Sequence, residues 1–287
     1  MRVTLRCLVP LLVLAALAPV PHVNGQDTGG DLRIVTLAPH LAELVHAVGA
    51  GRMLVGVSSW TDFPPEAAAL PVVGDAFAVD QEQLSLLEPD LLLAWESGTA
   101  ASIVDRLAAR GFRIETVRTR SLDDVARALE HIGRLTGHED GGRRAAQDFR
   151  DGVARLARQH GDAAAIRVFY QISRSPLYTV NGAHFVSELI GVCGGRNIFA
   201  DLDELAPLVD VEAVLVRDPE VMLASADSGP DAFDVWQRWP ELSANRYGNH
   251  FLLPASEIGR ATPRLLEAGK TLCETLDRAR ANRLHQR

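Results

Sequence analysis

The chain repeats one segment of its own sequence. VDQEQLSLLEPDLLLAW begins at Val79, and VDVEAVLVRDPEVMLAS begins 130 residues later, at Val209. In each copy a short helical stretch is followed by a proline and then by an apolar run typical of a buried strand. The two copies share two identical acidic residues, Asp80/Asp210 and Glu82/Glu212. The repeat predicts two related α/β units within one chain.

The segments around both copies alternate between short apolar runs and helical patterns. Strands are expected at residues 33–37, 53–57, 90–95, 113–117, 167–172, 221–224 and 251–253. Helices are expected at residues 40–48, 81–87, 102–110, 122–135, 184–192, 211–216 and 263–278. Such alternation is typical of mostly parallel sheets covered by helices. We therefore expect an α/β fold with two Rossmann-like lobes and a ligand cleft between them.

One segment between the two units differs from the rest. Residues 139–159 are rich in alanine, arginine and other charged residues and contain no proline. A flexible linker would instead be rich in glycine, serine or proline. The composition predicts a long, rigid helix at residues 139–162, starting near Gly141 or Gly142. The expected lobes are residues 32–138 and 163–284.

A second, weaker repeat involves a glutamate–leucine pair that is preceded by a histidine. Glu43 and Leu44 follow His40, and Glu188 and Leu189 follow His184, with a glycine after each helix. This spacing is 145 residues rather than 130, which indicates a loop insertion between the lobes. Chance similarity of two ordinary βα segments is the alternative explanation for both repeats.

The N-terminus has the features of a secretory signal. Two arginines precede the apolar run CLVPLLVLAALAPV, and this run is too short for a comfortable membrane span. Residues 1–25 are therefore predicted to be a signal peptide, with cleavage after Gly25. The mature chain keeps Cys193 and Cys273, and two cysteines in an exported chain suggest one disulfide. Two buried free thiols are the alternative.

Composition and motifs exclude several kinds of function. The net charge of −8 argues against a nucleic-acid partner. The sequence contains no nucleophile elbow, phosphate-binding loop or zinc-protease motif. We therefore expect no enzyme activity, no metal site and no catalytic cofactor. Aromatic residues instead concentrate at predicted strand ends and in the loops nearby, which favours a flat or apolar ligand: Trp60, Phe77, Trp95, Tyr170 and Tyr178.

Several segments together resemble a known family. In chain order these are TLAPHLAELVHAVGAG, GVSSWTDFPPEA, LEPDLLLAWESG, VCGGRNIF and RATPRLLEAGKTLC, and the resemblance covers about residues 32–281. The chain resembles the periplasmic cobalamin-binding proteins, which belong to the helical-backbone class of substrate-binding proteins. Members of this class serve ABC importers for cobalamin, haem and iron-siderophores. The resemblance implies a monomeric periplasmic protein that carries cobalamin, or a related corrinoid, as its transported ligand.

The resemblance also implies roles for individual residues. Glu82 and Glu212 match the glutamates that dock on the two membrane subunits of the importer. This role would explain the repeat, because a two-fold partner favours two like contact surfaces. The simpler explanation is that both glutamates favour the first turn of a helix.

The family's ligand-binding positions match Trp60, Trp95 and Arg260, and its cysteine pair matches Cys193 and Cys273. Phe77 is next to a position where the family has tryptophan and this chain has alanine. Two further family positions, a tryptophan and an aspartate, correspond to Ala206 and Ser256. Tyr170 completes the set of residues that we expect at the ligand.

Three other functions are weighed against cobalamin capture. Haem would need an axial ligand, and the candidates are Tyr170, Tyr178, His40 and His184. A ferric siderophore would favour more arginines near the cleft. An exported enzyme would need paired polar groups that converge in the cleft, and their spacing is not evident in the sequence.

Overall fold

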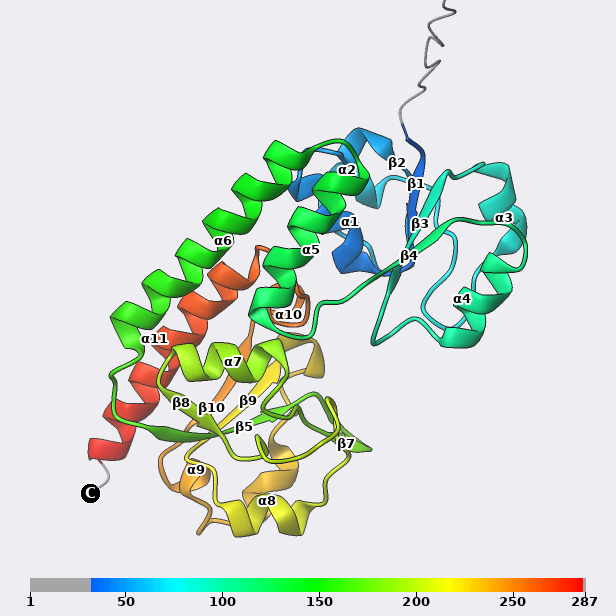
Figure 1. Ribbon diagram of the computed structural model, residues 1–287. Coiled ribbons are helices and arrows are strands. Elements are labelled where there is room, and N and C mark those ends of the chain that lie inside the picture. The colour runs from blue at the N-terminus through cyan, green and yellow to red at the C-terminus, as the bar shows by residue number, and fades with distance from the viewer. Residues whose placement is uncertain (1–31, 286–287) are drawn as a thin grey trace, which may run out of the picture. The chain divides into compact units, whose positions relative to one another are not determined.

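Two four-stranded parallel sheets form the framework of the molecule (Figure 1). The structure is a computed structural model and describes residues 32–285, so the predicted signal peptide lies outside the described residues. The first sheet contains β1 (Ile34–Thr36), β2 (Leu54–Gly56), β3 (Leu91–Trp95) and β4 (Ile114–Val117). The second contains β5 (Ile166–Gln171), β8 (Gly195–Asn197), β9 (Val221–Ser225) and β10 (His250–Leu253).

The strand order is β2-β1-β3-β4 in the first sheet and β10-β9-β5-β8 in the second. Every neighbouring pair in these two sheets is parallel. A short antiparallel hairpin, β6 (Ser173–Arg174) and β7 (Leu177–Tyr178), follows β5. The prediction of an α/β fold with mostly parallel sheets is confirmed.

Helices connect the strands within each sheet. The first set consists of α1 (Pro39–Ala47), α2 (Pro65–Ala68), α3 (Gln81–Leu86), α4 (Ala101–Ala108) and α5 (Leu122–Leu135). The second set consists of α7 (Phe185–Val192), α8 (Val211–Arg217), α9 (Ser243–Arg246), α10 (Ala255–Ile258) and α11 (Leu265–His285). None of the helices between residues 32 and 285 combines the length and apolar composition that a membrane span requires.

Successive residues of the central strands point into different cores. Leu91 and Leu93 of β3 belong to a large hydrophobic cluster that also contains residues of β5, β9, α7 and α11. Leu92 and Ala94 belong to a separate cluster with α3 and α4. This alternation follows from the two-residue period of a strand. Each sheet is therefore covered on both faces, and one core extends through both sheets.

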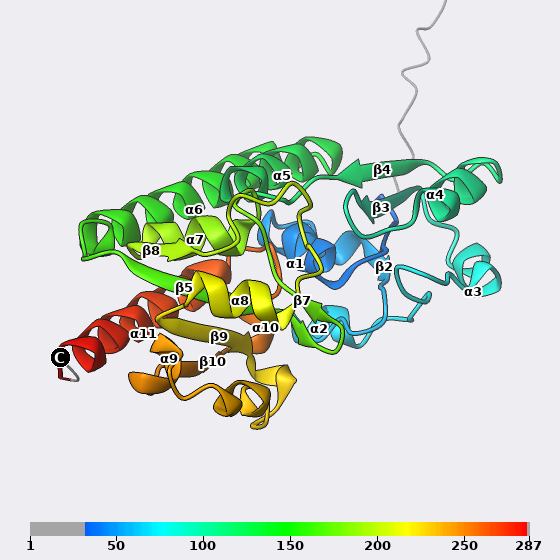
Figure 2. The ribbon, with the colours of Figure 1, turned by 90° about the horizontal axis from the view of Figure 1, so that it is seen from below.

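The long helix α6 (Glu139–His160) connects the two sets of elements and runs beside α5 and α11 (Figure 1 and Figure 2). It begins at Glu139, the first residue of the predicted range 139–162 and slightly before Gly141 and Gly142, and it ends at His160. Its buried residues form one stripe, and glycine allows its close approach to α5: a Cβ on Gly142 would lie 2.6 Å from the carbonyl oxygen of Leu129. We propose that α6 divides the chain into a first half, residues 32–138, and a second half, residues 163–284.

The repeated sequence folds in the same way in both halves. Asp80 is the N-cap of α3 and accepts from the backbone N–H of Glu82 and Gln83 at 3.0 Å. Asp210 is the N-cap of α8 and accepts from the N–H of Ala213 at 2.6 Å. An N-cap carboxylate satisfies N–H groups that the helix itself leaves unpaired. Helix capping therefore explains why the aspartate occurs in both copies of the repeat.

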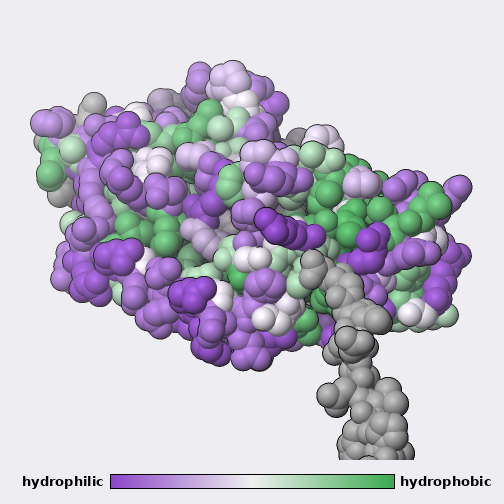
Figure 3. All heavy atoms as spheres, turned by 90° about the horizontal axis from the view of Figure 1, so that it is seen from above, coloured by the Kyte–Doolittle hydropathy of each residue, from purple (hydrophilic) through white to green (hydrophobic). Residues whose placement is uncertain are grey.

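The predicted disulfide between Cys193 and Cys273 is confirmed. It joins the end of α7 to α11, with the two Cα atoms 4.8 Å apart. Polar and charged side chains cover most of the face shown in Figure 3, with separate apolar patches between them.

Several short elements were not predicted, among them the hairpin β6–β7 and the four-residue helices α2, α9 and α10. Gly195 begins β8, a strand that was not predicted because its residues are glycine, arginine and asparagine. Gly194 has φ +69°, which suits a glycine after a helix. The last helix continues to His285, well beyond the predicted end at Arg278, and no proline or glycine interrupts this region.

Candidate functional site

The predicted ligand residues of the first half lie at the carboxyl ends of its strands. Trp60 is in the loop after β2, and Trp95 is the last residue of β3. Because β2, β1, β3 and β4 are parallel, these ends share one edge of the sheet. Ligands of open α/β sheets bind outside this edge.

Trp60 and Phe77 are the most exposed aromatic side chains at this edge, at 83% and 84%. Their loops are joined by a hydrogen bond of 2.6 Å from the backbone N–H of Ser59 to the carbonyl of Gly74. Asp75 shapes the Phe77 turn by accepting from the N–H of Phe77 at 2.8 Å. Trp60 has φ +66°, a conformation that is uncommon for a bulky residue and that often marks a functional position. Two large apolar rings thus face solvent on linked loops.

Trp95 is partly buried and tightly supported. Its ring contacts the backbone of Gly98, where an added Cβ would lie 1.9 Å from Cε3 of the indole. It also meets the His40 ring edge-on, with the ring centres 5.1 Å apart. The indole Nε1 is buried and has no hydrogen-bond partner within residues 32–285. The local structure therefore requires glycine at position 98.

Burial keeps His40 uncharged. It lowers the pKa of His40 to about 3, and the charge of Arg260 contributes in the same direction. His40 Nε2 lies 3.4 Å from the hydroxyl of Thr119, which follows β4. A neutral imidazole beside an indole fits an edge-on aromatic contact.

Arg260 binds protein groups with both of its terminal nitrogens. Nη1 donates to Glu43 at 3.0 Å and also pairs with Asp62, and Nη2 donates to the carbonyl of Trp60 at 2.9 Å. Ser256 donates to the same Asp62 at 3.1 Å. These contacts join a residue of the second half to the loop that carries Trp60. The guanidinium therefore holds the Trp60 loop in place.

Glu43 is the buried partner in this network, and sequence reasoning did not assign it a role. Burial raises the pKa of its carboxyl, against the opposing hydrogen bond from Arg260. Its side chain is only 2% exposed. A carboxylate is rarely buried so deeply unless it has a cationic partner, which here is Arg260. The available signal was an acidic residue inside the apolar helical pattern HLAELVHAV.

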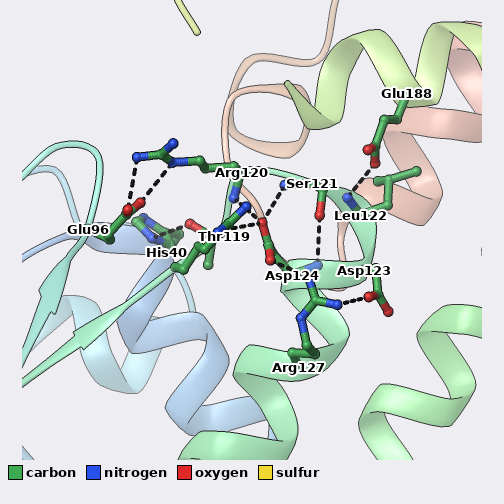
Figure 4. Close-up of polar contacts among 11 residues, drawn as sticks. His40, Glu96, Thr119, Arg120, Ser121, Leu122, Asp123, Asp124, Arg127 and Glu188 are labelled. Atoms are coloured by element: carbon green, nitrogen blue, oxygen red, sulfur yellow. Dashed lines mark hydrogen bonds and ion pairs between the residues drawn. The ribbon is translucent and has the colours of Figure 1, made fainter. Parts of the chain in front are cut away.

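A second set of contacts between the halves lies where β4 leads into α5 (Figure 4). Ser121 and Asp124 form a capping box at the start of α5. The N–H of Leu122 donates to Glu188 of α7 at 2.7 Å, and the N–H of Phe185 donates to the carbonyl of Arg120 at 2.7 Å. Glu43 and Glu188, the glutamates of the second repeat, thus each accept a hydrogen bond from the opposite half.

Pockets lie along these edges. One of 330 Å³ is lined by Arg118 and Arg120 of the first half and by Asn181 and Asp203 of the second. Another of 500 Å³ lies at the carboxyl ends of β5 and β9 and is lined mainly by polar residues. Aromatic rings are therefore exposed at the strand ends of the first half, whereas the pocket at the strand ends of the second half is mainly polar.

Tyr170 does not join this group of residues. It lies within β5, its side chain is 5% exposed, and burial raises the pKa of its hydroxyl above the ordinary range. Gln171, not Tyr170, ends the strand. The other haem-ligand candidates are also engaged or enclosed: His40 is buried, and His184 caps α7 by accepting from the N–H of Val186 at 3.2 Å. Tyr178 is the most exposed of the four, at 37%.

The predicted docking glutamates lie on matching helices, and Glu82 follows the loop of Phe77 by only five residues. Glu82 and Glu212 each occupy the second position of a short helix and are exposed. Neither forms an ion pair within the described part of the chain. Their carboxylates are free to meet a partner.

Comparison with known proteins supplies further findings. Residues 34–256 match the model of the periplasmic binding protein family. The chain is 36% identical to a vitamin B12-binding protein of Vibrio cholerae over 245 residues, which cover 85% of this chain and 88% of that protein. The crystal structure of the periplasmic vitamin B12-binding protein BtuF of Vibrio cholerae matches with a TM-score of 0.77, covering 86% of this chain and 97% of that one. The periplasmic haem-binding protein RhuT of Roseiflexus, at 24% identity and a TM-score of 0.76, shares the fold; the match covers 87% of this chain and 100% of that chain.

Proposed function

The chain belongs to the periplasmic binding protein family, and we propose that it captures cobalamin or a related corrinoid and delivers it to an ABC importer. The observation that carries this proposal is the 36% identity to the vitamin B12-binding protein of Vibrio cholerae over 85% of the chain. The haem-binding relative is less than 25% identical and supports the fold alone. The proposed location is the periplasm, reached through the predicted signal at residues 1–25, and the proposed active form is a monomer without enzyme activity.

The proposed binding surface consists of Trp60, Phe77 and Trp95. A corrin ring is broad and largely apolar on its faces, so exposed aromatic rings on linked loops suit it. Polar groups that line the pockets, such as Arg118 and Asn181, suit the amide groups at the rim of a corrinoid. Tyr170 is the weakest member of the predicted set because its hydroxyl and ring are enclosed in the core.

Arg260 is proposed to act on the ligand site indirectly, through the loop that carries Trp60. Its two nitrogens are engaged by Glu43, Asp62 and the carbonyl of Trp60. We therefore propose that Arg260 orients the Trp60 loop instead of binding the amides of the ligand. Asp62 of the first half supplies a carboxylate near the position where the family has an aspartate and this chain has Ser256.

Delivery requires a surface that the importer can recognise without blocking the ligand. Glu82 and Glu212 are proposed for this purpose because they are exposed, unpaired within residues 32–285 and equivalent in the two halves. Carboxylates suit bidentate recognition by arginine.

Calorimetric titration of the chain from Gln26 onward tests the proposed ligand. Cyanocobalamin, cobinamide and haemin are titrated in parallel. Sub-micromolar, one-to-one binding of cyanocobalamin without haemin binding is the expected result. Binding of haemin alone would refute the corrinoid proposal and leave the family assignment intact. Binding of cobinamide and cyanocobalamin with equal affinity would show that the lower axial base is not recognised.

A further inference from the structure

We propose that α3 and α8 each present a two-part contact surface to the importer: a carboxylate and an exposed aliphatic side chain one turn later. The carboxylates are Glu82 and Glu212, and the aliphatic residues are Leu86 and Val216. This inference rests on the proposed delivery to an importer and adds the apolar component of the contact.

The spacing places both parts on one face of each helix. Leu86 follows Glu82 by four residues, and Val216 follows Glu212 by four. Side chains four apart on a helix lie above one another. Leu86 is 72% exposed and Val216 is 85% exposed, so both are among the most exposed apolar side chains of the described residues.

The opposite face of each helix is anchored in the same way. Leu84 of α3 and Val214 of α8 are both 0% exposed. Leu84 packs in the cluster on the outer face of the first sheet, and Val214 packs in the cluster on the equivalent face of the second. In each helix the buried residue thus lies between the exposed glutamate and the exposed aliphatic residue. Because this packing is the same in both halves, Leu86 and Val216 occupy equivalent outward positions.

Helix capping does not require the two glutamates, and helix propensity does not favour Val216. Asp80 and Asp210 already cap the two helices, so the second acidic residue is not needed as a cap. Valine is a poorer helix former than leucine or alanine, yet Val216 lies on an exposed helical face. A single exposed aliphatic residue is common on protein surfaces. Its recurrence beside the same carboxylate at the same helical position in both halves is the observation that points to a partner.

The chemistry of the surface defines that partner. A carboxylate beside an aliphatic side chain is complementary to a cationic side chain beside an apolar recess. Two such surfaces on one chain fit two like membrane subunits related by two-fold symmetry. An anionic bilayer is a poor alternative occupant because the chain has a net charge of −8 and both surfaces carry a carboxylate.

The test measures binding to the ABC importer of the same bacterium, purified in lipid nanodiscs. Four forms of the chain from Gln26 onward are compared: unsubstituted, Leu86→Ser/Val216→Ser, Glu82→Ala/Glu212→Ala, and the control Leu284→Ser. Leu284 is 67% exposed and lies on α11, away from both repeated helices in sequence. Each form is first titrated with cyanocobalamin to verify that its fold and ligand site are intact.

The proposal predicts that the Leu86/Val216 variant binds the importer about 10- to 100-fold more weakly, since two aliphatic side chains lose their burial at the contact. The Leu284 variant is expected to match the unsubstituted chain. If the glutamate variant loses binding and the Leu86/Val216 variant keeps it, the apolar part is wrong and the docking role of the glutamates stands. If both variants bind normally, or the unsubstituted chain does not bind, both the contact surface and the proposed delivery are refuted.

Discussion

The two halves of the molecule are alike on their outer helices and different at the strand ends. On the outside, α3 and α8 share an aspartate cap, a buried aliphatic anchor and an exposed glutamate. At the strand ends, the first half exposes Trp60 and Phe77. The second half encloses most of its aromatic residues, with Tyr178 the most exposed at 37%, and the fully buried Trp236 donates to Gln171 at 2.9 Å.

This difference matches two kinds of recognition. A partner with two equivalent subunits favours equivalent surfaces, and repetition of α3 and α8 supplies them. A single ligand that lacks this symmetry imposes no such requirement, so the strand ends of the two halves can differ. The comparison leads to four predictions, which concern the disulfide of the second half, a buried histidine in each half, the exposed aromatic residues and the contact that joins the halves.

The largest expected effect concerns stability. Within residues 32–285 the disulfide Cys193–Cys273 lies in the second half, and 80 residues separate its cysteines. The double variant Cys193→Ala/Cys273→Ala should lose about 4 kcal/mol of unfolding free energy, because the unfolded chain gains the freedom of that loop. Guanidinium denaturation measures the loss. An unchanged denaturation midpoint would mean that the disulfide adds nothing to the stability that the packing of α7 against α11 already provides.

The next effect is a pH dependence that both halves share. Burial lowers the pKa of His40 to about 3 and that of His184 to about 4. In the unfolded chain both titrate near 6.5, so the unfolded state binds protons first as the pH falls. The contribution of each histidine to the free energy of unfolding is therefore fully present above pH 6.5. Between pH 6.5 and pH 4 it should decrease by about 1.4 kcal/mol per pH unit for each histidine.

His40→Gln and His184→Gln should each reduce that slope by a similar amount, as measured by denaturation at several pH values from 4 to 7. A slope that neither variant changes would show that other groups control the acid sensitivity. A change in one variant alone would show that the two repeated histidines are not equivalent.

The third prediction concerns ligand affinity. Trp60→Ala should weaken cyanocobalamin binding by about 1–3 kcal/mol, because a large aromatic contact is lost. Tyr178→Ala, a change at the most exposed aromatic residue of the second half, should leave affinity within about twofold. Isothermal titration calorimetry measures the affinity of each variant for cyanocobalamin. Equal losses in both variants would contradict the assignment of the aromatic contacts to the first half.

The smallest expected effect separates positioning from direct contact. Arg260→Lys keeps a positive charge beside Glu43 but cannot also donate to the carbonyl of Trp60 in the same geometry. Cyanocobalamin affinity should fall about tenfold, and the quenching of tryptophan fluorescence by the ligand should decrease.

The positioning role has its own control. In the Trp60→Ala background, Arg260→Lys should produce little further loss of affinity, since the loop it holds no longer carries the indole. Two fully additive losses would instead favour a direct contact between Arg260 and the ligand.

Local patterns in the sequence were sufficient to predict most of the fold. The strands at β3 and β9 were evident because a parallel strand buried on both faces is an unbroken apolar run, as in Leu91–Ala94. The repeat of Asp80 and Asp210 predicted two equivalent helices. This feature is also local, because an N-cap residue contacts only the first turn of the helix that it caps. Gly195–Asn197 escaped prediction because this strand consists of glycine, arginine and asparagine and has no apolar residue.

The candidate site was less predictable, since it depends on contacts between distant segments. Arg260 and Glu43 are 217 residues apart, and no local rule pairs them. Tyr170 was expected at the ligand because it is near a strand end, but the strand continues through Gln171 and its central position in the sheet encloses the tyrosine. The resemblance to a family identified Arg260 but gave no indication that Asp62 and Glu43 would engage its guanidinium.

The most direct test of the account is a crystal structure of the chain bound to cyanocobalamin. The account predicts that the corrin contacts Trp60 and Trp95, that Arg260 remains paired with Glu43, and that Glu82 and Glu212 stay exposed. A corrin that lies only against the second half, with Trp60 and Trp95 in solvent, would contradict it.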